Sequence, residues 1–192
     1  MSMNNYLKYL SLNSFFTSIS AVIATNSMLN SIVDKPSYTS TMTTTYIGKD
    51  IIGQLGGILY SLKTGRNADK TPLKYITTGF ILQQTAFAIE NFAPMITNKD
   101  IILPLLGVSS CLKNISFITI GAVNATNLQK ISPENIGKFY SQVASFNTLS
   151  SSLGMIVGIG ILNYEPGLQN KNIFMFLSGL GSFYYLRKST KI

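Results

Sequence analysis

Long uncharged segments alternate along the chain with short segments that carry charges, prolines or glycines. The uncharged segments are rich in hydrophobic side chains, and none shows the sustained period-2 alternation that indicates a β-strand. We therefore predict an all-α protein of about five or six helices. The predicted helices cover residues 9–32, 45–62, 73–92, 101–127, 138–162 and 172–187.

The segments between the predicted helices contain turn-forming residues. Ser132-Pro133-Glu134 is a good helix start, since Ser can cap, Pro fits the first helical position, and an acid suits the positive end of the helix dipole. The Thr-rich run from Tyr38 to Thr45 is predicted to link the first two helices. We expect the whole chain, residues 1–192, to form one helical domain.

Composition narrows the choice of protein class. Only 11% of the 192 residues are charged, against about 25% in a typical soluble domain, and Ser, Thr and Asn take the place of the missing charges. Histidine is absent and Cys111 is the only thiol, which excludes His-ligated metals, His-based acid–base catalysis and a disulfide framework. We expect no metal and no cofactor. A polytopic membrane protein and an unusually uncharged soluble helical domain remain.

The net charge of +8 raises the question of a nucleic-acid partner. Only Arg66 and Arg187 could make bidentate contacts with bases, and the lysines are scattered singly and do not form a stripe. We therefore expect no nucleic-acid partner. Basic residues that flank uncharged segments instead indicate the cytoplasmic edge of a lipid bilayer.

If all six helices cross a bilayer, ten basic residues fall on one side and four on the other, which places both termini in the cytoplasm. An in-plane position of residues 45–62 would move the amino terminus to the opposite side. The run after Lys8 is longer and more polar than a signal-peptide core, so we expect a retained helix in a multi-pass intracellular membrane protein. The richer side carries Lys8, Lys63, Arg66, Lys70, Lys74, Lys130, Lys138, Arg187, Lys188 and Lys191; the other carries Lys35, Lys49, Lys99 and Lys171.

Small residues recur four apart on several predicted helices. This spacing puts them on one helix face and lets two backbones approach closely. We expect packing within the chain, although such faces could also form a substrate groove or an interface with a second copy or a family partner. The predicted helix-packing positions are Gly53, Gly56, Gly57, Gly121, Ala122, Gly154 and Gly158.

Three acids are the candidate functional residues: Asp50 and Glu90, at the edges of uncharged runs, and Asp69, in a basic loop. An acid within a membrane domain is costly and therefore often functional. The structural alternatives are stabilisation of a helix dipole by Asp50, an interfacial position for Glu90 and a solvated charge at Asp69.

We expect Asp50 and Glu90 to face the protein interior. There they could share a mouth between helices 45–62 and 73–92. Their polar partners would be hydroxyls and amides such as Gln54, Gln83 and Thr85, or a lysine such as Lys49 or Lys113. Paired carboxylates could support hydrolysis, but no sugar-binding aromatic cluster accompanies them, and we predict no enzymatic activity.

Residues 46–62 resemble the signature segment of the root UV-B sensitive family, also described as vitamin B6 photo-protection and homeostasis proteins. Asp50, Gly53, Leu55 and Gly56 match its acid, its glycine and its Leu-Gly step. The likeness continues in order over about residues 10–160. Further matches are Asp69, Glu90, Pro94, Gly121, Ala122, Thr148, Leu149 and Gly154.

The chain departs from this family's pattern at charged positions. Val123-Asn124 stands where the family has Thr-Arg, and Phe146-Asn147-Thr148 where it has Gln-Glu-Thr. The chain therefore resembles a divergent, shortened member, and we expect it to lack the family's soluble carboxy-terminal region. The resemblance implies an integral membrane protein of unsettled biochemistry, associated with UV-B responses and vitamin B6 homeostasis. We expect it to bind or move a small solute or to scaffold such a process; the alternative is a helical interaction module without transport activity.

Overall fold

The computed structural model describes residues 2–32, 39–64, 70–96, 98–131, 133–164 and 168–190. These residues form six α-helices and two short 3-10 helices, and they contain no β-strand. The all-α prediction is therefore confirmed for the described part of the chain. The helices are α1 (Met3–Ile32), α2 (Thr39–Thr64), α3 (Pro72–Phe92), α4 (Lys99–Ile131), α5 (Ile136–Tyr164) and α6 (Leu168–Ser189); the 3-10 helices are η2 (Ala93–Met95) and η3 (Pro133–Asn135).

Each helix lies where the uncharged segments predict one, with one clear correction. The Thr-rich run is not a linker, because α2 already begins at Thr39. Thr has a lower helix propensity than Ala by only a few tenths of a kcal/mol, and no Gly or Pro interrupts residues 39–47. Ser132 lies outside the described residues, but Pro133 does begin a helical turn with Glu134 inside it.

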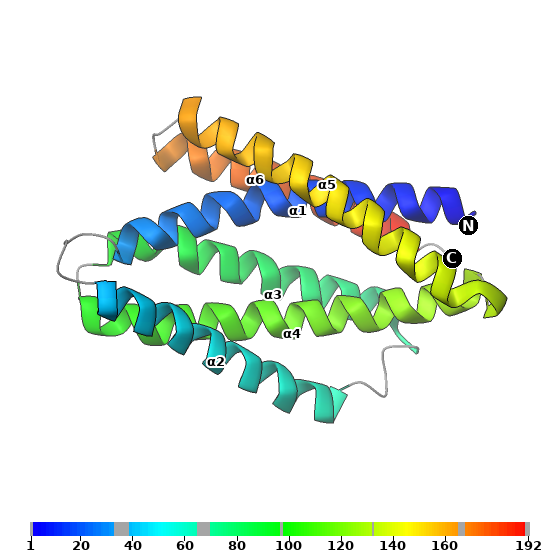
Figure 1. The fold of residues 1–192 in the computed structure, drawn as a ribbon, viewed down its shortest axis with the longest axis horizontal. Helices are drawn as coiled ribbons and strands as arrows, with labels where there is room; N and C mark the ends of the chain where they lie inside the picture. Colours follow the sequence, from blue (N-terminus) through cyan, green and yellow to red (C-terminus); the bar gives the residue numbers. More distant parts are fainter. Residues whose placement is uncertain are drawn as a thin grey trace.

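Consecutive helices alternate in direction, and both termini lie at the same end of the molecule (Figure 1). Helix α1 is the central element: it packs against α3, α5 and α6. Helix α4 packs against α2 and α3 on the other side. The molecule thus has two layers, with α5, α1 and α6 above α3, α4 and α2 in Figure 1.

Glycines bring two pairs of helices into close contact. A Cβ atom added at Gly53 of α2 would lie 2.7 Å from Ser110 Oγ of α4, and one added at Gly56 would overlap Cys111 Sγ. On α5, a Cβ at Gly154 would overlap the backbone oxygen of Phe15 in α1. The Phe15 oxygen belongs to the backbone and cannot rotate away, so Gly154 sets the spacing of α1 and α5, while Gly53 and Gly56 leave room for the side chains of α4.

The remaining predicted helix-packing residues fall into three groups according to what lies next to them. Gly57 and Gly158 also face their partner helices, at 3.1 Å from Asn114 Cβ and 3.0 Å from Val22 Cβ respectively. Ala122 packs beside the buried cluster around Val123. Gly121 differs from the expectation, since nothing lies within 4 Å of where its Cβ would stand. It faces open space and sets no helix contact.

The distribution of polar and apolar side chains is unusual for a soluble domain. Among the described residues, the buried set contains nearly as many polar side chains as hydrophobic ones, while large hydrophobic side chains are exposed along α2, α5 and α6. Two stretches, Ile101–Ile131 and Pro133–Tyr164, are long and apolar enough to cross a membrane. Within the best such window of the second stretch, only 11% of the residues are buried inside the protein.

Candidate functional site

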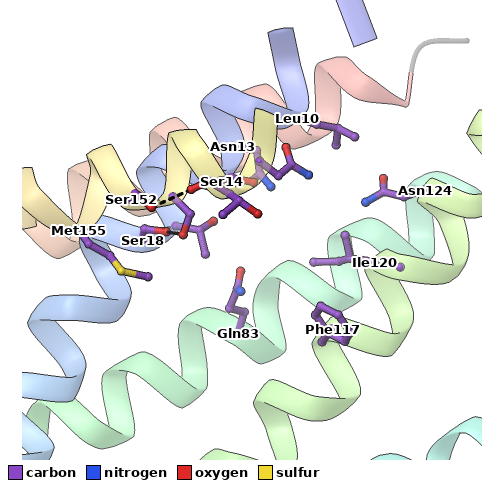
Figure 2. Close-up of a pocket in the computed structure, with 15 residues that line it drawn as sticks. Leu10, Asn13, Ser14, Ser18, Gln83, Phe117, Ile120, Asn124, Ser152 and Met155 are labelled. Atoms are coloured by element: carbon purple, nitrogen blue, oxygen red, sulfur yellow. Dashed lines mark hydrogen bonds between the residues drawn. The ribbon is translucent and has the colours of Figure 1, made fainter. Parts of the chain in front are cut away.

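A cavity of about 460 Å³ lies between α1, α3, α4 and α5 (Figure 2). Ten of the 15 residues that line it carry a hydroxyl or an amide, and none carries a charge. The cavity exists because α4 and α5, although consecutive in the chain, pack against different helices: α4 against α2 and α3, and α5 against α1. The polar lining residues are Asn13, Ser14, Thr17, Ser18, Gln83, Asn124, Asn147, Thr148, Ser151 and Ser152.

The cavity has a closed floor and an open side. Its α1 and α3 residues are buried or half-buried, as Ser18 and Gln83 illustrate. Its α4 and α5 residues include exposed ones, among them Phe117, whose exposed fraction is 79%, and Met155. The opening therefore lies between α4 and α5, the helices of the two apolar stretches.

Several lining side chains are held by hydrogen bonds within the protein. The Ser18 and Ser151 hydroxyls are 2.6 Å apart and join α1 to α5. Tyr6 donates its hydroxyl hydrogen to Asn124 Oδ1 at 3.3 Å, and Ser182 donates to Asn13 Oδ1 at 2.8 Å. These bonds fix the walls and leave the amide NH₂ groups of both asparagines as donors.

Three other lining side chains have no hydrogen-bond partner among the described residues: Ser14 of α1, Gln83 of α3 and Asn147 of α5. Asn147 Oδ1 is buried as well as unpaired. Figure 2 shows Gln83 extending from α3 towards α1 and α5. A buried polar atom without a partner costs free energy unless water or a ligand supplies one, so a water molecule or a solute in the cavity would stabilise Asn147 Oδ1.

Glu90, a candidate acid, is almost completely buried, with an exposed fraction of 1%. Ser109 of α4 donates a hydrogen bond to Glu90 Oε1 at 3.0 Å, and Lys113 Nζ lies 2.5 Å from Oε2. Lys113 Nζ also lies 5.1 Å from the centre of the Phe87 ring. The acid thus faces the protein interior and pairs with Lys113, one of the two expected lysines.

Asp50, the second acid, lies on the other side of α4. Lys49 Nζ is 2.7 Å from Asp50 Oδ1, and Ser110 donates a hydrogen bond to the same oxygen at 3.3 Å. The Asp50 side chain is 45% exposed. Because Glu90 binds Ser109 and Asp50 binds Ser110, α4 stands between the two acids, and they do not share the expected mouth between α2 and α3.

The remaining sequence candidates add no chemistry to the cavity. Asp69 lies outside the described residues. Cys111 is half-buried and faces Gly56 at the contact between α4 and α2. In the part of the chain that the structure describes, no group of three or more Cys, Asp or Glu side chains could hold a metal ion.

Apart from Gln83, which was expected beside the two acids, sequence reasoning assigned no cavity residue to a site, although two signals pointed to these residues. Asn13, Ser14, Thr17 and Ser18 follow helical spacing, which marks one polar face of α1. Asn124 and Asn147 are positions where the chain departs from the family's charged pattern, and both line the cavity. Only the packing of four helices brings the two sets together.

The chain is similar to a described protein family along almost its whole length. The profile of the family described as the vitamin B6 photo-protection and homoeostasis domain matches residues 2–190, more than the 10–160 expected from the quoted motifs. The protein named RUS family member 1 from Dictyostelium discoideum is 22% identical over 157 residues. These residues are 80% of this chain but only 30% of that relative, so the chain spans less than a third of its length. No solved structure matches. Since the profile covers almost every residue, the chain belongs to the vitamin B6 photo-protection and homoeostasis (RUS) family.

Proposed function

We propose that this chain is a multi-pass membrane domain that binds a small solute inside its helical bundle and catalyses no reaction. The observation that carries the proposal is the reversed polarity of the molecule: polar side chains are buried while large hydrophobic side chains cover the outer faces of α2, α5 and α6. In water, so much exposed apolar surface would favour aggregation; in a bilayer, it contacts lipid.

Helix α1 illustrates why helices with modest hydropathy can enter a membrane in this fold. Its hydroxyls find partners on neighbouring helices: Ser20 and Ser178 are 2.6 Å apart, and Ser27 donates to Asn91 Oδ1 at 2.8 Å. Polar groups that would be costly in lipid are paired inside the bundle. Helices α4 and α5 would insert by their own hydropathy, and α1 would then be stabilised by its contacts with α3, α5 and α6.

The alternating helices support an orientation with both termini in the cytoplasm. The end of the bundle that holds the termini also holds the basic residues at the end of α4 and the start of α5, Lys130 and Lys138, and those at the end of α6, Arg187 and Lys188 (Figure 1). The opposite end holds Lys99 and Lys171, at the starts of α4 and α6. This bias is typical of a cytoplasmic face.

The family description supplies the class of solute. Because it associates this domain with vitamin B6 homoeostasis, we propose that the solute is a form of vitamin B6. The cavity between α1, α3, α4 and α5 is the site, since it combines sufficient volume with hydrogen-bonding groups that lack partners within the described residues.

Alkaline carbonate extraction followed by flotation of the tagged chain tests the membrane proposal. We expect the protein to stay with the lipid fraction after extraction. Release into the soluble fraction as a monodisperse protein would refute the proposal and favour a soluble helical interaction module.

A further inference from the structure

The charges around the cavity restrict what it can bind. No lining residue is charged. The nearest cation along α4 is Lys113, which lies one helical turn before the lining residue Phe117, and its ammonium group is bound to Glu90. A phosphate or a carboxylate in the cavity would therefore lose its hydration without gaining a positive partner, which is strongly unfavourable.

The unpaired groups define what the solute must offer. Ser14, Gln83 and Asn147 lie on three different helices, and an amide both donates and accepts hydrogen bonds; of these three, Asn147 has a buried atom without a partner among the described residues. A solute that satisfies them together needs several groups that can also donate and accept, and hydroxyl groups meet that requirement without charge. The volume of about 460 Å³ accommodates a molecule of one ring with short substituents.

The apolar part of the lining lies mainly near the opening. Phe117 of α4 and Met155 of α5 are exposed there, and Ile120 of α4 is half-buried beside them in the lining, so a solute bound by its hydroxyls in the polar floor would present its other face to apolar side chains. An aromatic or aliphatic ring is well suited to that contact.

We infer that the cavity binds a hydroxyl-bearing ring of no net charge and rejects its phosphorylated form. The inference rests on the proposed function only in taking the ring from the vitamin B6 class; the polarity and neutrality of the cavity stand on their own. Within that class the ligand is the free alcohol, pyridoxine, and the excluded molecule is pyridoxine 5′-phosphate.

Binding to the full chain in lipid nanodiscs tests this inference, with three probes measured by equilibrium dialysis or calorimetry: pyridoxine, pyridoxine 5′-phosphate and the uncharged polyol myo-inositol. We expect pyridoxine to bind at least about tenfold more tightly than its phosphate ester, because the ester brings an unpaired charge. Gln83→Leu and Asn147→Leu should each weaken pyridoxine binding about tenfold by removing a hydrogen-bonding amide. Gln54→Leu, on the exposed face of α2, is the matched control and should leave binding unchanged.

Asn124→Arg is a variant that should gain affinity for the phosphate ester. A cation at this lining position should improve binding of the phosphate ester relative to pyridoxine, because it supplies the missing partner. If the wild-type chain binds the ester as tightly as pyridoxine, or if both amide variants bind like the Gln54→Leu control, the inference is wrong.

Binding of myo-inositol distinguishes a failure of the cavity inference from a failure of the vitamin B6 proposal. Binding of myo-inositol but not pyridoxine, with the same loss in Gln83→Leu, would support a site for neutral hydroxylated solutes and refute a vitamin B6 ligand. Binding of none of the uncharged probes to a chain that floats with lipid would overturn the cavity inference and leave the membrane proposal intact.

Discussion

The contact between α5 and α1 at Gly154 gives a prediction whose magnitude follows from the structure. A methyl group there would overlap a backbone atom, the oxygen of Phe15, which cannot move away as a flexible side chain can. Gly160 lies on the same helix with nothing within 4 Å of its Cβ position. Gly154→Ala and Gly160→Ala are thus a matched pair that changes the same residue type in the same helix and differs in packing alone.

The two variants should shift stability in opposite directions. Gly to Ala in a helix interior stabilises by about 1 kcal/mol when the methyl group meets no other atom, and this is the expectation for Gly160→Ala. At Gly154 the same gain is offset by overpacking, which costs about 1–3 kcal/mol. Separation of the helices would also stretch the 2.6 Å bond between Ser18 and Ser151, a loss of about 1 kcal/mol. We therefore expect Gly154→Ala to be less stable than Gly160→Ala by about 2–4 kcal/mol.

Thermal denaturation in one detergent, followed by far-UV circular dichroism, measures the difference. For a chain of this size 1 kcal/mol corresponds to about 2–4 °C, so the two melting temperatures should differ by about 5–15 °C. Equal melting temperatures, or a Gly154→Ala variant as stable as the wild type, would refute the close backbone contact between α1 and α5.

Two further predictions concern topology and the buried ion pair. Single cysteines at the exposed positions Asn98 and Asn135, in a Cys111→Ser background, should react with a membrane-impermeant thiol reagent from opposite sides of the membrane; labelling of both from one side would show that α4 does not cross. Glu90→Gln should lower stability by about 1–3 kcal/mol because it leaves the Lys113 ammonium without its partner, and the further change Lys113→Met should recover part of that loss by removing the unpaired charge. Unchanged melting of the single variant in the same detergent assay would show that the ion pair does not stabilise the fold.

The helices could be predicted from sequence because their signal is local. Absence of charge over a dozen or more residues located all six, and the one failure, at Thr39–Thr45, came from treating a low-complexity run as a linker. The lysine partners of Asp50 and Glu90 could also be predicted from the sequence. Lys49 is adjacent to Asp50, and Lys113 is the only cation within the predicted helix 101–127.

The cavity could not be predicted, because it depends on which helices do not touch. No local pattern shows that α5 packs on α1 and diverges from α4, and this divergence brings Gln83 and Asn147 to the same space although they are far apart in sequence. The same divergence explains the failed expectation at Gly121. Its spacing is that of a helix-packing glycine, but the helix that would have covered it lies elsewhere.

The candidate acid and the cavity are related through the contact between α3 and α4. Gln83 and Glu90 are seven residues apart, and Lys113 and Phe117 are four apart, so each pair lies on one face of its helix. The ion pair therefore lies along the same seam as the cavity, one to two helical turns away. Because Glu90 binds the Lys113 ammonium, we infer that it keeps this cation away from the polar floor. Glu90 would then act on the solute indirectly, by preserving the neutrality of the site, and Glu90→Gln should lessen the discrimination between pyridoxine and pyridoxine 5′-phosphate while Asp50→Asn, on the far side of α4, should leave it unchanged.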